Sequence, residues 1–264
     1  METSITIFAV SLENKTKAEL FELFKACLNG SKQKMIVTPN PEMLVFARKN
    51  KLFCAVLNHA AARLIDGFGL TLAARLFYGI TLERFPGVSA VRDIIIIAAQ
   101  KSKKVFLLGG NDAVLKKVIA MWSREFPQFQ IMGAVGPRIT LDQNNENGFR
   151  VDETENKCAI ALIQQAAPDI LLVGFGHGKQ ELWISAMLSR FPSVRLAMGV
   201  GGSFDYLSGL VPRAPRWMRK IGLEWLYRLA CEPRRIKRIF NAVVVFPLYV
   251  ILEKICDLQK RCIS

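Results

Sequence analysis

The feature that most constrains this chain is a repeated alternation of short apolar runs with amphipathic stretches of helical length. Continuous apolar strands separated by such helices are typical of parallel β-α units, in which helices cover both faces of the sheet. The expected strands are residues 4–10, 35–38, 62–65, 105–108, 130–135, 170–173 and 195–200. The expected helices are 16–28, a helix beginning at Glu42, 69–78, 88–101, 112–125, 155–166 and 179–190, with a loop over 140–156. The pattern therefore predicts an α/β fold with a Rossmann-like, mainly parallel sheet.

Length and composition fit one large domain with an appendage. The chain has 264 residues, of which 51% are apolar, so a sizeable core can be buried and general disorder is not expected. The composition changes near Pro212, where basic and aromatic residues begin to crowd together. We therefore predict a catalytic α/β domain over residues 1–211 and a basic, apolar helical appendage over 212–264.

Glycine follows several of the expected strands. Gly109-Gly110, Gly174 and Gly201-Gly202 each come at the end of an apolar run. In open α/β sheets, ligands bind beyond the carboxyl ends of the strands, and glycine there lets a phosphate approach the backbone. Ordinary turn glycine is the alternative for each one alone, whereas all three together favour a nucleotide site. A G-x-G-x-x-G motif after the first strand and a Walker A lysine loop are both absent from the sequence.

The charge of the chain predicts an anionic partner. The net charge is +14, which suits a nucleic acid, an anionic lipid surface or a phosphate-bearing substrate. Beyond Pro212 a basic and aromatic stretch is followed by a nearly continuous apolar run over 240–252. That order is typical of a segment that lies in a membrane interface, and an apolar run has no use in a nucleic-acid groove. A solvated basic face beside a core helix is the alternative.

The apolar run is judged too short to cross a bilayer, and Pro247 is expected to kink its helix. The N-terminal residues have no basic region followed by a long apolar stretch, so we predict no signal peptide. The expected location is the cytoplasm, with peripheral binding to the inner face of the plasma membrane.

The cysteines and histidines do not form a metal-binding pattern. The six cysteines make no C-x-x-C pair, and His59 and His177 are the only histidines. Buried thiols in a reducing compartment are the expected state of the cysteines. We therefore expect neither a metal site nor another cofactor.

Four polar residues can meet in one place, and three of them lie where expected strands end. Asp66 precedes a glycine, Thr38 and Asn40 flank a proline, and Arg84 lies further along the chain. Strand ends of a parallel sheet meet at one edge, so these side chains can share a pocket. A carboxylate there can accept a proton from a hydroxyl nucleophile, and an arginine can stabilise a leaving diphosphate. Taken singly, each residue also fits a turn or a surface role.

Several segments together resemble the WecG/TagA/CpsF family of bacterial glycosyltransferases, over about residues 35–240. They are residues 38–42 (TPNPE), 66–69 (DGFG), 83–87 (ERFPG), 173–183 (VGFGHGKQELW), 199–209 (GVGGSFDYLSG), 213–217 (RAPRW), 222–228 (GLEWLYR) and 233–238 (PRRIKR). The resemblance implies inverting transfer of a sugar from a UDP-sugar to a polyprenyl-diphosphate-linked sugar, in the synthesis of cell-surface polysaccharides.

The resemblance also implies roles for individual residues. Asp66 would be the base on the acceptor hydroxyl, and Arg84 would contact the donor diphosphate. Thr38, Asn40 and Gln180 would line the pocket, while Gly109, Gly110, Gly174, Gly201, Gly202 and Asp205 would hold UDP, with Asp205 at the ribose. The family has no metal-binding D-x-D pair and none is found here, so cationic side chains and backbone amides would take the place of a metal.

In this family the C-terminal appendage docks on the membrane and closes over the active site, and Arg228, Arg235 and Arg238 match that pattern. The chain departs from the family at Ile65, where alanine is common, and at Gly178, where proline is common. Gly178 predicts a more flexible loop, and the neighbouring His177 is interpreted as a polar loop residue or a substrate contact.

Two other functions remain compatible with parts of the sequence. A nucleotide-binding oxidoreductase would explain the glycines but not the tail, and a non-enzymatic membrane-binding module would explain the tail but not Asp66, Arg84 and Gln180. N-acetylmannosamine, its uronic acid and glucose are all open as the donor sugar, as is the acceptor sugar. A homo-oligomer is compatible with the sequence, which does not decide the oligomeric state.

Overall fold

A parallel sheet of six strands forms the centre of the computed structural model, which describes residues 4–263. The strand order is β4-β3-β10-β9-β5-β6, and every neighbouring pair is parallel. The strands are β3 (Lys34–Val37), β4 (Ala62–Arg63), β5 (Val105–Gly109), β6 (Ile131–Ala134), β9 (Ile170–Gly174) and β10 (Leu196–Gly199). The predicted α/β fold with a Rossmann-like parallel sheet is therefore confirmed.

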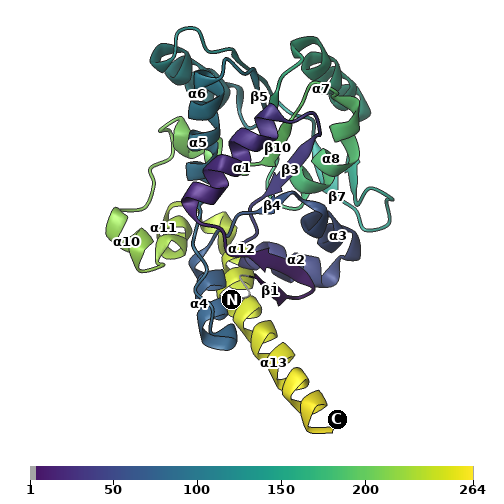
Figure 1. Ribbon diagram of the computed structural model, residues 1–264, viewed down its shortest axis with the longest axis vertical. Helices are drawn as coiled ribbons and strands as arrows, with labels where there is room; N and C mark the ends of the chain where they lie inside the picture. The colour runs from purple at the N-terminus through teal and green to yellow at the C-terminus, as the bar shows by residue number, and fades with distance from the viewer. Residues whose placement is uncertain (1–3, 264) are drawn as a thin grey trace.

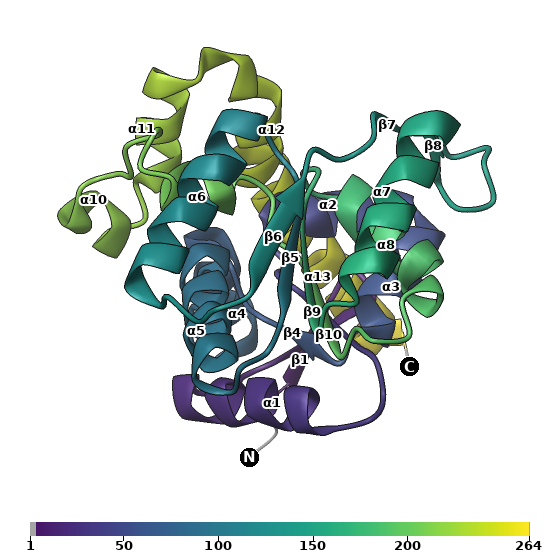
Figure 2. The ribbon, with the colours of Figure 1, turned by 90° about the horizontal axis from the view of Figure 1, so that it is seen from above.

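Helices cover both faces of this sheet, as the continuous apolar strands predict (Figure 2). On β9, Ile170 and Leu172 face one core cluster, whereas Leu171 and Val173 face the other, because side chains alternate along a strand. The first cluster includes side chains of α1 (Lys17–Asn29), α5 (Gly87–Gln100), α6 (Asp112–Glu125) and α9 (Ser203–Leu207). The second includes side chains of α2 (Pro41–Lys49), α3 (Lys51–His59), α4 (Phe68–Tyr78), α7 (Glu153–Ala166) and α8 (Lys179–Met187), which a 3-10 turn, η1 (Leu188–Arg190), follows.

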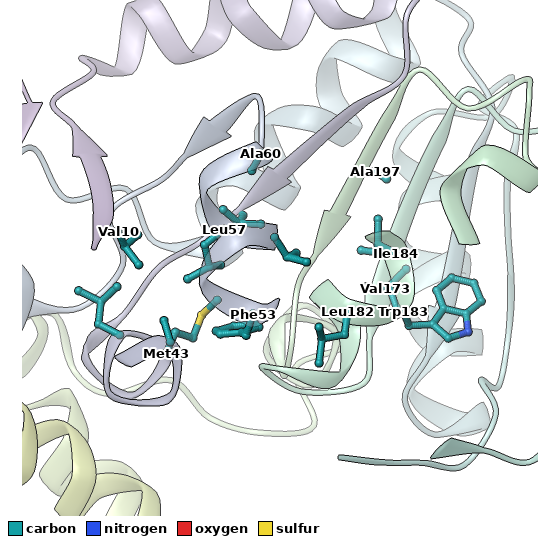
Figure 3. Packing of buried hydrophobic residues seen from close by; sticks show 14 of the residues in the cluster. Val10, Met43, Phe53, Leu57, Ala60, Val173, Leu182, Trp183, Ile184 and Ala197 are labelled. Atoms are coloured by element: carbon teal, nitrogen blue, oxygen red, sulfur yellow. The ribbon is translucent and has the colours of Figure 1, made fainter. Parts of the chain in front are cut away.

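Figure 3 shows the packing of the second cluster around β9 and β10. Met43 and Phe53 extend from α2 and α3, and Trp183 extends from α8; all three are almost fully buried. The helix predicted to begin at Glu42 is two helices, because Asn50 interrupts it. The Asn50 side chain accepts a hydrogen bond from the Phe53 backbone N–H at 2.8 Å, and this cap starts α3.

Two hairpins lie outside the main sheet, and both correct the sequence prediction. The single strand expected over 4–10 is instead an antiparallel hairpin of β1 (Ser4–Ile7) and β2 (Val10–Glu13). Its two turn residues, Phe8 and Ala9, have positive φ angles without being glycine. The loop expected over 140–156 contains β7 (Ile139–Leu141) and β8 (Phe149–Val151), which also pair antiparallel.

The Phe8 turn supports the C-terminal helix. The Phe8 ring lies 5.8 Å from the Phe246 ring and 6.3 Å from the Tyr249 ring, measured between centroids, in edge-to-face geometry. Phe8 and Phe246 are both buried in the same core cluster. This packing accounts for a bulky residue in the left-handed region, where turn glycine would be the usual choice.

The C-terminal segment is helical throughout most of its length. It contains α10 (Arg216–Lys220), α11 (Glu224–Cys231), the 3-10 turn η2 (Pro233–Arg235), α12 (Ile236–Phe240), the π-helical turn η3 (Asn241–Val245) and α13 (Phe246–Ile263). Figure 1 shows α13 projecting from the α/β body. Phe246 and Val250 are buried in the core of that body, so the start of α13 is anchored to it. The domain boundary at residue 212 stays a prediction.

Helical structure runs on through Pro247 in the described backbone, and the kink expected at this residue stays a prediction. The π-helical turn ends at Val245 and includes the position four residues before Pro247, where a proline ring would collide with the backbone of a regular α-helix. Within the described residues, the segment Ile236–Cys256 is long and apolar enough to cross a membrane by length and composition, with 11% of its apolar window buried. The expectation that no segment reaches this length was therefore wrong.

Candidate active site

A polar cavity of about 300 Å³ lies at the carboxyl edge of the sheet, where the loops after β3, β4, β9 and β10 meet. Parallel strands bring these loops together, as the sequence predicted. The cavity is lined by most of the predicted site residues, namely Thr38, Asn40, Asp66, Gly174, Gln180, Gly201, Gly202, Asp205, Arg228, Arg235 and Arg238.

A second cavity, of about 420 Å³, adjoins the first between α4 and the C-terminal helices. Its walls are more apolar and include Phe68, Leu72, Trp225 and Val243. The two cavities share Asn40, Asp66, Glu224, Arg228, Arg235 and Arg238. The shared residues show that a polar compartment and an apolar compartment meet at Asp66.

Asp66 is held at this junction by its backbone and its carboxylate. Its backbone N–H donates to the Pro39 carbonyl at 2.9 Å, which ties the loop after β4 to the loop after β3. The Gly87 N–H, at the start of α5, donates to Asp66 Oδ2 at 3.4 Å. Gly67 then turns with φ +104°, and a Cβ on it would lie 3.0 Å from the Pro41 ring. These contacts explain why glycine follows the acid.

The surroundings of Asp66 change its acidity. Burial raises the pKa of the Asp66 carboxyl, while the charges of Arg228 and Arg84 and the hydrogen bond from Gly87 act in the opposite direction. A carboxylate whose pKa is raised is a stronger proton acceptor than an exposed one. A raised pKa and a place at the junction of the two cavities are both compatible with the predicted role of Asp66 as a general base, which stays a prediction.

Arg84 lines the second cavity together with Asp66. Its guanidinium lies 3.5 Å from the Glu224 carboxylate and donates to the Arg219 carbonyl at 3.3 Å. Glu224 also lies 3.2 Å from Arg228 and 3.9 Å from Arg213. Glu224 therefore lies within ion-pair distance of three arginines beside the junction of the cavities. This position of Glu224 was not predicted from the sequence, although an acid among so many basic residues was a usable signal.

Gln180 connects two of the glycine loops. Its side-chain Oε1 accepts from the Gly201 N–H at 2.9 Å, and its Nε2 donates to Glu181 Oε1 at 2.7 Å. Glu181 Oε2 in turn accepts from the Gly178 N–H at 2.7 Å. Glu181 is fully buried, and this burial raises its pKa to about 7. Glu181 is a second residue whose role the sequence analysis missed, although it stood in a quoted motif.

Arg238 connects α12 to the opposite wall. Its Nε donates to both carboxylate oxygens of Glu42 at 3.0 and 3.1 Å, and its Nη2 donates to His177 Nδ1 at 2.7 Å. Burial and the nearby cations Arg238, Lys179 and Arg235 lower the pKa of His177 to about 3, so the imidazole is neutral. His177 Nε2 then carries the proton and lies 3.2 Å from Glu42.

Gly178 explains the local departure from the family pattern. Its φ is +81°, a conformation that proline cannot adopt. Glycine therefore gives the loop a path that places His177 against Glu42 and Arg238. The predicted flexibility of this loop stays a prediction.

The glycines after β5 lie apart from the other predicted residues. Among the described residues, the linings of both cavities leave out Gly109 and Gly110. A Cβ on Gly109 would lie 2.9 Å from the Gly174 carbonyl and from the Phe175 ring. Close packing between neighbouring strand ends accounts for glycine at this position, and the predicted contact with UDP stays a prediction.

Comparisons with known proteins give one consistent result. The family model described as "Glycosyl transferase WecG/TagA/CpsF family" matches residues 5–260. A Bacillus subtilis (strain 168) protein named N-acetylglucosaminyldiphosphoundecaprenol N-acetyl-beta-D-mannosaminyltransferase is 33% identical over 83% of this chain and 80% of its own length. Relatives with the same name occur in Bacillus spizizenii, 33% identical over 84% and 79%, and in Staphylococcus aureus (strain NCTC 8325), 28% identical over 89% and 87%.

Proposed function

Because this chain belongs to the glycosyl transferase WecG/TagA/CpsF family and is a glycosyltransferase, we propose that it joins N-acetylmannosamine to a polyprenyl-diphosphate-linked N-acetylglucosamine. The proposed donor is the UDP-sugar. The observation that carries the proposal is the junction of a basic, polar cavity with an apolar cavity at the carboxylate of Asp66. The printed names of the relatives supply the two sugars.

The polar cavity suits the nucleotide end of the donor. Glycine backbone from Gly174 and Gly201 borders it, and Arg228, Arg235 and Arg238 supply positive charge. Backbone amides and guanidinium groups are suited to a diphosphate, because they form charge-assisted hydrogen bonds to its oxygens. Asp205 lies in the same cavity, in keeping with its proposed contact with the ribose hydroxyls.

The apolar cavity suits the lipid-linked acceptor. Phe68, Leu72 and Val243 offer a surface for the first part of an isoprenoid chain. Arg84 lies at the polar end of this cavity, beside Asp66 and Glu224. This position also suits a contact with the acceptor diphosphate, and the predicted contact of Arg84 with the donor diphosphate stays a prediction.

The chemistry follows from the position of Asp66. An acceptor hydroxyl in the apolar cavity loses its proton to the Asp66 carboxylate as its oxygen attacks the anomeric carbon of the donor. The bond from that carbon to the diphosphate breaks with inversion, and UDP leaves with the bonding electrons. The arginines shared by the two cavities stabilise the negative charge that develops on the diphosphate.

The C-terminal segment supports a peripheral membrane location, which we propose for the inner face of the plasma membrane. Its apolar helix is mostly exposed, and basic residues precede it. Attraction of about 1 kcal/mol for each basic residue near an anionic surface gives reversible binding when several act together. The protein would then reach a lipid-linked acceptor that stays in the bilayer.

A transfer assay tests the proposed function. The full-length protein is incubated with a polyprenyl-diphosphate-linked N-acetylglucosamine and one of three donors: UDP-N-acetylmannosamine, its uronic acid or UDP-glucose. We expect a disaccharide product only with UDP-N-acetylmannosamine. Transfer of one of the other sugars would refute the proposed donor, and failure with every donor would refute the proposed reaction.

A further inference from the structure

Helix α4, which lies outside the C-terminal appendage, exposes an apolar surface. Helix α4 has two apolar faces. One face, with Leu70, Ala73 and Ala74, is buried in the core. The other carries Phe68, Leu72 and Leu76, which are 39%, 42% and 66% exposed. These three residues follow one another at intervals of four, so they form one stripe along the helix.

The charges on and near α4 and α13 favour an anionic partner. Helix α4 contains no acidic residue, and its only charged residue is the exposed Arg75. Three further cations lie around the neighbouring aromatic rings. The Lys254 ammonium lies 3.5 Å from the centroid of the Tyr78 ring at the end of α4, while Arg48 and Lys49 lie against the Tyr249 ring of α13. Exposed apolar helices that have cations beside them are suited to the interface of an anionic bilayer.

The stripe adjoins the apolar C-terminal helix. Figure 1 shows α4 and α13 at the same end of the molecule, away from the sheet. The contact between Lys254 and Tyr78 joins these two helices directly. Helix α13 exposes its own apolar side chains at Leu248, Ile251, Leu252 and Ile255. Two neighbouring apolar helices at one end of the protein offer a broader contact than a single anchoring helix.

The stripe is also continuous with the apolar cavity. Phe68 and Leu72 are exposed on α4 and at the same time line the cavity that Val243 and Pro247 border from the other side. A lipid chain lying in a bilayer against this stripe would meet the apolar wall of the cavity without crossing water. This relationship rests on the proposed lipid-linked acceptor.

We propose that α4 is a second membrane-contacting element, which inserts the stripe Phe68, Leu72 and Leu76 into an anionic phospholipid bilayer beside α13. The protein therefore contacts the bilayer through two helices, which orients the apolar cavity toward the lipid. The appendage attaches the protein, and α4 determines which way it faces.

Vesicle binding of Leu76→Glu tests this proposal. Among the described residues, Leu76 is outside the linings of both cavities, so its replacement leaves the site residues unchanged. Leu162→Glu is the matched control, because Leu162 is an exposed leucine on α7, which lies away from α4 (Figure 1). The full-length proteins are sedimented with phosphatidylcholine vesicles that contain about 30% phosphatidylglycerol, or with phosphatidylcholine alone.

We expect Leu76→Glu to weaken partition into the anionic vesicles about tenfold, as the lost burial of one leucine side chain predicts. Leu162→Glu should bind like the unaltered protein, and all three proteins should bind phosphatidylcholine weakly. Unchanged binding of Leu76→Glu, or equal losses in both variants, would overturn the proposal. A change in oligomeric state without a change in vesicle binding would assign the stripe to self-association and would also overturn it.

Fluorescence provides a second test that does not depend on weakened binding. Leu76→Trp adds an indole to the stripe, and brominated lipids should quench the additional emission in vesicles, whereas Leu162→Trp should add emission that is not quenched. Equal quenching in the two variants would contradict insertion of α4.

Turnover on a short-chain, water-soluble acceptor separates membrane contact by α4 from the proposed sugar transfer. Leu76→Glu should turn over this acceptor at the rate of the unaltered protein. Failure of the unaltered protein to turn it over would count against the proposed function instead.

Discussion

The guanidinium of Arg238 donates from Nε to both carboxylate oxygens of Glu42, at 3.0 and 3.1 Å, and so joins helix α12 to the start of α2. Glu42 and Arg238 are 196 positions apart in the sequence. Both line the apolar cavity, and Arg238 also lines the polar one. This pair therefore holds the C-terminal segment in place over the site.

Glu42→Gln should loosen that attachment. The variant keeps the shape of the side chain but removes its charge, so the charge-assisted bond to Arg238 weakens. We expect the free energy that holds the C-terminal segment on the α/β body to fall by about 1 kcal/mol. This value is small for a hydrogen bond to a charged group, because Arg238 is partly exposed to water. Faster proteolysis within residues 212–264 would report the change. Glu146→Gln, at an exposed acid between β7 and β8, is the control. Equal cleavage rates in the two variants would show that the pair does not hold the segment.

The buried carboxyl of Glu181 should give the stability of the protein a measurable pH dependence. Its pKa is raised from 4.5 to about 7, so the folded state binds this proton more tightly than the unfolded state. The resulting stability is fully present below about pH 4.5 and is lost as the pH rises to about 7. The unfolding free energy of the unaltered protein, relative to Glu181→Gln, should therefore fall across this window, by at most about 3 kcal/mol. Denaturant unfolding at several pH values measures it, and a constant difference would contradict the assigned pKa.

Transfer should proceed without a divalent metal. The polar cavity is lined by Arg213, Arg228, Arg235 and Arg238, which can stabilise a leaving diphosphate in place of a metal. Turnover should therefore be the same in excess chelator as in buffer with magnesium. A loss of turnover in chelator that added magnesium or manganese restores would show that a metal takes part.

The sequence predicts which side chains meet at the edge of the sheet better than it predicts the outer parts of the fold. Thr38, Asn40, Asp66, Gln180 and Asp205 meet in one cavity because parallel strands place their carboxyl ends at one edge, and the apolar runs already indicated parallel strands. The family membership then removes the oxidoreductase and the non-enzymatic module as alternatives.

The missed features depend on contacts between distant segments. The turn at Phe8 and Ala9 has no glycine or asparagine to indicate it, and it is stabilised by the rings of Phe246 and Tyr249 from the other end of the chain. Glu224 acquires its role only when folding brings Arg84 and Arg213 to it. Local patterns carry little information about such pairs.

The π-helical turn before Pro247 was not predicted for a related reason. Proline predicts a kink when it is considered alone, and here a π-helical turn precedes it while the helix continues. The burial of Phe246 and Val250 against the body supports that geometry. The pattern of apolar residues alone did not indicate this π-helical turn.

Turnover of Asp66→Asn, measured beside its affinity for UDP, tests the central claim most directly. Asparagine keeps the size of the side chain and a hydrogen-bond acceptor for the Gly87 N–H, but it cannot take a proton from the acceptor hydroxyl. We predict that kcat falls by about a thousandfold, within the range expected for loss of a general base, while the Kd for UDP and the unfolding midpoint stay near those of the unaltered protein. Turnover by Asp66→Asn at the unaltered rate would contradict the assignment of Asp66 as the base.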